Sequence, residues 1–199
     1  MIVNTQSNQV ERNFYESNRK KKKAILETTF HLLNQKTIRE ITVDEIAHKA
    51  DVSKVTLFKY FHSKNQLINQ VIRQNLNQLS MEIKTLIESN LDFNQTYQAI
   101  LQLKIQQLEH YQPIFSENMM TQYTNSPELL DDDALSLQKQ IYLLLFQKGQ
   151  AEGKISSDYS QEDFLLILSI FNSGMKGLSM NLLIEKAEIV SRFFLNGWK

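Results

Sequence analysis

An all-helical fold is predicted by this 199-residue sequence. Only five residues are Gly and two are Pro, so the residues that most often break helices and form tight turns are scarce. Apolar residues recur at helical spacing, as at Phe164, Ile167, Leu168 and Phe171. The hydrophobic share of 42% is that of an ordinary globular protein, which argues against a disordered chain.

Helix boundaries follow from capping and breaking signals. Residues 1–17 are polar and aperiodic, and the sequence predicts a flexible lead over residues 1–18, with the first helix running from Arg19 to Lys36. Thr42 with Glu45, and Ser63 with Gln66, have the spacing of a capping box, and Ser53 is a third N-cap candidate. Further helices are predicted at 42–50, 53–60, 63–89, 93–111, 113–123, 127–152, 161–180 and 182–197.

Charge is unevenly distributed although the formal net charge is zero. Residues 19–64 contain eleven Lys or Arg against five acids, whereas residues 65–199 contain ten against fifteen. A basic segment followed by an acidic body fits a polyanion-binding surface, or a chance fluctuation on a solvated surface. The run Arg19–Lys23 fits either an arm that contacts phosphate or a solvated helix start.

Several classes of function lack the residues that they need. There is no Cys, so a disulfide framework and thiolate metal sites are excluded, and this fits a cytoplasmic protein. The four His form no metal-binding pair, and no nucleophile-elbow, dinucleotide or P-loop motif occurs. Asp131–Asp133 suits a helix start better than a cation site. We expect no enzyme activity, metal, cofactor, signal peptide or membrane span.

Residues 42–61 have the pattern of a helix-turn-helix, in which the second helix enters the major groove of DNA. The two helices would be held together by apolar Ile46, Ala47, Ala50, Val52, Leu57 and Phe61. The outward residues combine cations and hydroxyls for phosphates or base edges with a methyl group for thymine. The candidate DNA contacts are Thr42, Ser53, Lys54, Val55, Thr56, Lys59, Tyr60 and Lys64.

The stretch 25–67 resembles, without a gap, the DNA-binding domain of TetR-type transcriptional regulators. The resemblance is carried by Ile25–Leu33, Thr42–Val43, Ile46–Ala47, Ala50, Val52–Ser53, Thr56–Leu57, Tyr60–Phe61, Ser63–Lys64 and Leu67. Beyond it, only the length, the helical character and the turn Glu152–Ile155 are similar to that family.

Four positions depart from the family pattern. Thr37 stands where a Gly usually ends the first helix, so Asn34 or Gln35 is expected to close that turn. Asp51 replaces the turn Gly, and Asp tolerates the left-handed conformation better than most residues. Val55 stands at a frequent Gly position, either as a base-contacting methyl donor or as a filler. Phe58 lacks the hydroxyl of a common Tyr.

The resemblance implies a DNA-binding domain over residues 19–66 and a helical ligand-binding and dimerisation domain over residues 67–199. It implies a homodimer, a palindromic operator and a small, lipophilic inducer held in the body. Aromatic and Met side chains there are either core or ligand contacts: Phe93, Tyr97, Phe115, Met119, Tyr123, Tyr142 and Phe146. The last two helices would pair between subunits through Phe164, Phe171, Met175, Leu183, Val190 and Phe194.

The expected function is therefore that of a repressor that a small molecule releases from DNA. Two alternatives stay open. One is a DNA-binding regulator without a small-molecule ligand, which a protein partner controls or which acts constitutively. The other is a helical enzyme, which would need a cluster of perturbed titratable groups in a cleft.

Overall fold

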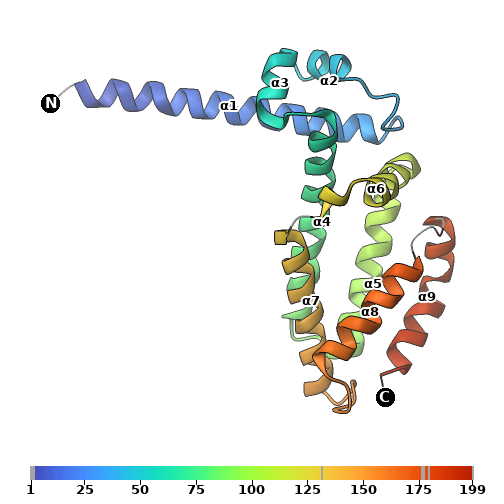
Figure 1. Ribbon diagram of the computed structural model, residues 1–199. Coiled ribbons are helices and arrows are strands. Elements are labelled where there is room, and N and C mark those ends of the chain that lie inside the picture. Colours follow the sequence, from blue (N-terminus) through green and yellow to red (C-terminus); the bar gives the residue numbers. More distant parts are fainter. Residues whose placement is uncertain (1–2, 131, 176–177, 179, 199) are drawn as a thin grey trace. The chain divides into compact units, whose positions relative to one another are not determined.

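The computed structural model describes residues 3–130, 132–175, 178 and 180–198. These residues form helices and turns and contain no strand, which confirms the predicted all-α fold. The α-helices are α1 (Val3–Leu33), α2 (Val43–Lys49), α3 (Lys54–Phe61), α4 (Lys64–Ile87), α5 (Phe93–His110), α6 (Pro113–Asn125), α7 (Asp132–Ala151), α8 (Gln161–Met175) and α9 (Met180–Asn196) (Figure 1). A 3-10 turn, η1 (Pro127–Leu129), precedes α7.

The chain divides into two compact units. The N-terminal unit comprises Met1–Ile72 and Gln112–Met119, and the C-terminal unit comprises Arg73–Tyr111 and Met120–Lys199. The sequence placed the domain boundary at residue 66 and assigned the whole of 112–119 to the body. The structure instead groups the first half of α6 with α1, α2 and α3.

In the N-terminal unit, α1, α2 and α3 pack on one another. Ile25, Leu32 and Leu33 of α1 are buried, as are Ile46 of α2 and Leu57 of α3. Helices as short as α2 and α3 do not persist alone in water, so this shared core is what holds them in place.

Helix α1 is longer than the sequence predicted. It begins at Val3 rather than at Arg19, so the polar lead forms the first half of a continuous 31-residue helix. The stretch contains no Gly or Pro to interrupt it. The start of α1 has no apolar face to bury. It therefore lacks hydrophobic periodicity, which is the signal used to find helices in a sequence.

In the C-terminal unit, α5, α7, α8 and α9 surround an aromatic core. The Phe164 ring lies 5.1 Å from that of Phe146 and 4.8 Å from that of Trp198, measured between centroids. The Phe194 ring stacks on Tyr97 at 5.7 Å. The core thus joins α5 and α7 to α8, α9 and the end of the chain.

The predicted helix 127–152 is divided in the structure. Pro127 begins η1, and α7 starts only at Asp132, where Asp132 and Asp133 occupy its first turn. Carboxylates are favoured at that end of a helix because the exposed N–H groups carry partial positive charge. None of the described helices is long and apolar enough to cross a membrane.

Candidate nucleic-acid interface

The turn between α2 and α3 fixes the angle of α3. Asp51 adopts a left-handed conformation with φ of 52°, as expected for the residue that replaces a turn Gly. The next residue, Val52, donates its backbone N–H to the Ala47 carbonyl at 3.0 Å. Ser53 then caps α3, because its hydroxyl accepts the Thr56 backbone N–H at 3.1 Å.

The buried side of this motif contains the residues that the sequence predicted. Of the six, Ile46, Ala47, Ala50, Leu57 and Phe61 are buried, and Val52 is half-buried. At the other end, Thr42 caps α2 by accepting the Glu45 backbone N–H at 3.1 Å. The capping box is only half formed, since the Glu45 carboxylate pairs with Lys36 at 2.6 Å instead.

The outward side of α3 is open. Val55 exposes 79% of its surface, and no packing role accounts for an apolar side chain there. Lys59, one helical turn further on, is also exposed. Lys54 pairs with Asp44 of α2 in an exposed contact, and Thr56 contacts the Ser53 hydroxyl at 2.9 Å. These groups give α3 a methyl, hydroxyl and ammonium surface of the kind that binds duplex DNA.

Tyr60 has a partner that sequence reasoning missed. Its hydroxyl donates to Oδ1 of Asn18 in α1 at 2.7 Å, which uses the single proton of the phenol. The Asn18 amide keeps two N–H donors. Asn18 fell within the predicted flexible lead, so no local pattern marked it as a neighbour of α3.

Lys64 is directed into its own unit. Its ammonium donates to the carbonyl oxygens of Ile38, at 2.6 Å, and Ile41, in the loop that leads to α2. Burial lowers the pKa of this ammonium below its usual range. Two of its three N–H groups are therefore used to hold the loop, and Lys64 as a phosphate contact stays a prediction.

Asn118 of α6 fastens the end of α1. It is only 4% exposed, and its amide donates to the carbonyls of Leu33 at 2.9 Å and Lys36 at 2.8 Å. Its Oδ1 accepts the Ile38 backbone N–H at 3.0 Å. Asn34, as predicted, also helps to close this turn through a bond to the Phe30 carbonyl at 2.8 Å. The bonds of Asn118 span some 80 residues, so sequence periodicity could not reveal them.

Comparison with known proteins matches residues 25–71 to the model for bacterial regulatory proteins of the tetR family. Residues 25–71 of this chain are therefore similar to a tetR-type DNA-binding domain. The HTH-type transcriptional regulator EthR of Mycobacterium tuberculosis is 35% identical over 69 residues, which are 35% of this chain and 32% of EthR. The match therefore spans about a third of the length of this curated relative.

Solved tetR-type structures share the fold over most of the chain. The fatty acid degradation regulator FadR of Bacillus halodurans has a TM-score of 0.66 at 15% identity, covering 88% of this chain and 94% of that one. FadR of Bacillus subtilis, solved in complex with stearoyl-CoA, has a TM-score of 0.62 at 15% identity and covers 87% and 97%. At such identities the likeness concerns the fold alone.

The seven predicted ligand contacts are distributed over both units. Phe93 and Phe146 are buried in the C-terminal core, and Tyr97 and Tyr142 pack against it. Tyr123 is more exposed. Phe115 and Met119 belong to the N-terminal unit, where the Phe115 ring lies 5.2 Å from that of Phe30. A cavity lined by the whole set stays a prediction.

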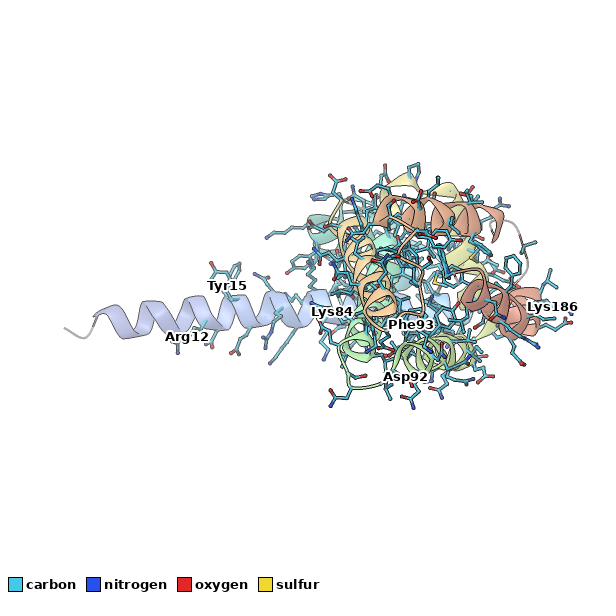
Figure 2. All side chains as sticks on the ribbon, turned by 90° about the horizontal axis from the view of Figure 1, so that it is seen from below. Arg12, Tyr15, Lys84, Asp92, Phe93 and Lys186 are labelled. Carbon is cyan, nitrogen blue, oxygen red and sulfur yellow. The ribbon has the colours of Figure 1, made fainter. Side chains whose placement is uncertain are left out.

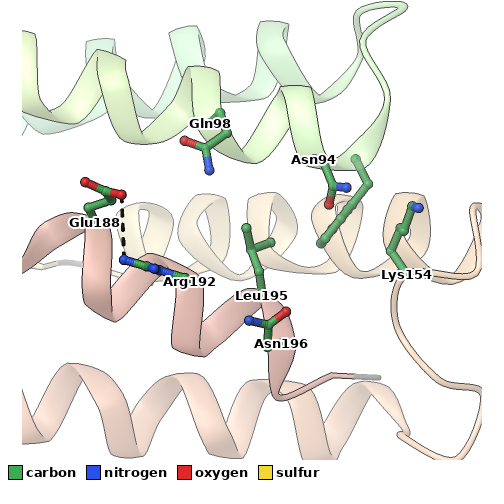
Figure 3. A pocket seen from close by; sticks show the side chains of 8 residues that line it. Asn94, Gln98, Lys154, Glu188, Arg192, Leu195 and Asn196 are labelled. Atoms are coloured by element: carbon green, nitrogen blue, oxygen red, sulfur yellow. Dashed lines mark ion pairs between the residues drawn. The ribbon is translucent and has the colours of Figure 1, made fainter.

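A polar pocket of about 400 Å³ opens between the start of α5, the turn after α7 and the end of α9 (Figure 3). Phe93 is the member of the predicted ligand set that lines it. Arg192 pairs with Glu188 at 3.7 Å on its edge. The remaining lining residues are Asn94, Gln98, Lys154, Leu195 and Asn196.

The predicted dimer contacts include both buried and exposed residues. Phe164 and Phe194 are buried in the core of the protomer itself, and Phe171 packs against that core. Val190 is exposed. The side chains of Met175 and Leu183 lie outside the described residues.

Proposed function

We propose that this chain is a homodimeric, sequence-specific DNA-binding repressor that a small lipophilic ligand releases from a palindromic operator. The observation that carries the proposal is the exposed side of α3 in a tetR-type helix-turn-helix. Val55 and Lys59 lie there without a packing role, on a helix whose other side is locked into the N-terminal unit.

Dimer formation is supported by an exposed apolar face in the C-terminal unit. Leu166 and Ile170 follow each other by one turn on α8, and Ile189 and Phe193 do so on α9. Each exposes about 60% of its surface or more. An apolar patch of this kind is expected to be covered by a partner, and a second copy covers it symmetrically. Two α3 helices about 34–36 Å apart would then reach successive major grooves.

Release by a ligand is supported by the aromatic composition of the body. Tyr97 is the side chain best suited to orient a bound molecule, because its phenol lies beside the Ser191 hydroxyl within an aromatic core. Burial raises the pKa of that phenol. A ligand that binds better to protomers whose α3 helices are wrongly spaced would draw the population away from DNA.

Selection of bound fragments from random duplex DNA tests the DNA-binding part. The expected product is a palindrome, and Val55→Ala should change the preference at one position of each half-site. Lys59→Ala should weaken binding to all sequences alike, because an ammonium reads phosphate rather than base. Absence of any enriched sequence would overturn the proposal.

Ligand release is tested on the selected operator by fluorescence anisotropy, with stearoyl-CoA and a panel of lipophilic acids and cations as probes. An active compound should dissociate the complex and raise the melting temperature of the free protein. If no compound does either, the regulator without a small-molecule ligand becomes the better description.

A further inference from the structure

The first half of α1 continues the face that α1 buries in the N-terminal unit. Further along the helix, Ile25 and Thr29 are fully buried. Towards the N-terminus the same face presents Lys22, whose ammonium lies 5.8 Å from the centre of the Phe61 ring, and then Asn18, which holds Tyr60. Two successive turns of α1 therefore lie against α3, the helix proposed to read DNA.

Before Asn18, α1 extends away from the rest of its unit (Figure 2). Phe14 and Tyr15 are exposed by 60% and 70%. Arg12 lies six residues beyond Asn18, which is about 9 Å along a helix. Arg12, Arg19 and Lys23 are spaced by seven and four residues, so they share one side of α1.

The charge of this segment is not compensated within the protein. Residues 12–23 contain six cations and one carboxylate. Lys23 pairs with Glu27 at 3.5 Å, but Arg12, Arg19, Lys20 and Lys21 form no ion pair with any described residue. Like charges three or four residues apart destabilise a helix, and a polyanion beside them removes that repulsion.

We propose that Arg12–Lys23 of α1 is a second DNA-binding element, which contacts the phosphates of the duplex flanking the half-site that α3 reads. The inference rests on the proposed function and adds a separate contact surface to it. Its support is the charge complementarity with phosphate and the continuity with α3 through the bond between Asn18 and Tyr60. Over about 9 Å, a helix lying along the duplex passes two to three base pairs.

The test compares two duplexes with the same selected operator at the centre. The short duplex ends at the outer edges of the half-sites, and the long one carries about ten further base pairs of arbitrary sequence on each side. We expect the wild-type protein to bind the long duplex on the order of tenfold more tightly at 0.1 M salt, with a steeper salt dependence.

The variant Arg12→Ala/Arg19→Ala should lose the advantage of the long duplex while binding the short one like the wild type. The control Lys104→Ala/Lys139→Ala removes the same charge from exposed positions of the C-terminal unit and should keep that advantage. The proposal is overturned if the wild type does not prefer the long duplex, or if the arginine variant keeps the preference. It is also overturned if that variant loses affinity equally for both duplexes. Wild-type protein that binds neither duplex would instead refute the proposed function itself.

Discussion

At the scale of single residues, the direction in which a side chain's polar atoms point indicates whether it contributes to stability or to DNA binding. Lys59 and Lys64 are similar in the sequence, five residues apart at the edge of the same motif. The structure separates them, because Lys59 is exposed whereas the Lys64 ammonium binds two loop carbonyls. Residue type and spacing identified the outward surface of α3, but they could not give the direction of a flexible side chain.

Lys64→Met should therefore lower the free energy of unfolding by about 1–2 kcal/mol, because the carbonyls of Ile38 and Ile41 lose a charged donor while the aliphatic stem remains. Urea denaturation measures the change. Lys59→Met is the matched control and should leave the stability unaltered. Equal stability of the two variants would show that the Lys64 bonds contribute nothing measurable.

Glu45 gives a pH-dependent test. The hydrogen bond from Lys36 holds the pKa of the Glu45 carboxyl below its ordinary value of 4.5, with a further contribution from Lys49. A carboxyl with a lowered pKa in the folded state adds stability that is complete above its ordinary pKa and is lost as pH falls through the lowered one.

Glu45→Gln should accordingly be less stable than the wild type at pH 7, and the difference should shrink as pH falls below 4.5 and through the lowered pKa. Urea midpoints measured from pH 7 to pH 3 test this. Glu16→Gln, which removes an exposed carboxylate from the middle of α1, serves as the control. A difference that stays constant over the whole range would contradict the assignment.

At the scale of elements, capping residues predicted where helices begin better than periodicity predicted their length. Ser53 and Thr42 cap the helices that the sequence assigned to them. Periodicity failed for the start of α1, which has no apolar face, and for 127–152, where a buried Leu129 precedes the true start of α7. A helix can be found from the sequence where it buries a stripe of apolar residues, and it is missed where it has no such stripe.

Close packing between elements is testable at Gly149 of α7. A Cβ added there would lie 2.6 Å from Cδ1 of Ile155 and 2.8 Å from the Phe93 ring. Gly149→Ala should destabilise the protein by about 1–3 kcal/mol through overpacking. Gly174→Ala in α8 meets nothing within 4 Å and should be neutral or slightly stabilising. Thermal denaturation compares them, and equal melting temperatures would mean that the contact relaxes freely.

At the scale of the whole molecule, the sequence predicted two functional parts but not how the chain is shared between them. The basic segment and the capping signals marked the motif at 42–61. The contribution of 112–119 to the N-terminal unit depends on Asn118 and Phe115, whose partners are distant in the sequence. Contacts over such separations leave no periodic trace in one sequence.

The proposed dimer is the prediction that belongs to this scale. Phe193→Glu should yield monomers, because the exposed Phe193 ring would become an unpaired charge in an apolar interface. Analytical ultracentrifugation measures the mass. Asn196→Glu, on the pocket side of α9, should remain dimeric. A Phe193→Glu protein that sediments as the wild type does would exclude this face as the interface.

The hydrogen bonds of Asn118 affect how the DNA specificity of this chain could be transferred to another protein. A recombination event or a designed chimera that joins residues 1–72 to another body would move α3 without the segment Gln112–Met119. The carbonyls of Leu33 and Lys36 and the N–H of Ile38 would then need new partners. To transfer the operator recognition of this chain to another protein, the helix-turn-helix and the separate segment that contains Asn118 therefore have to be transferred together.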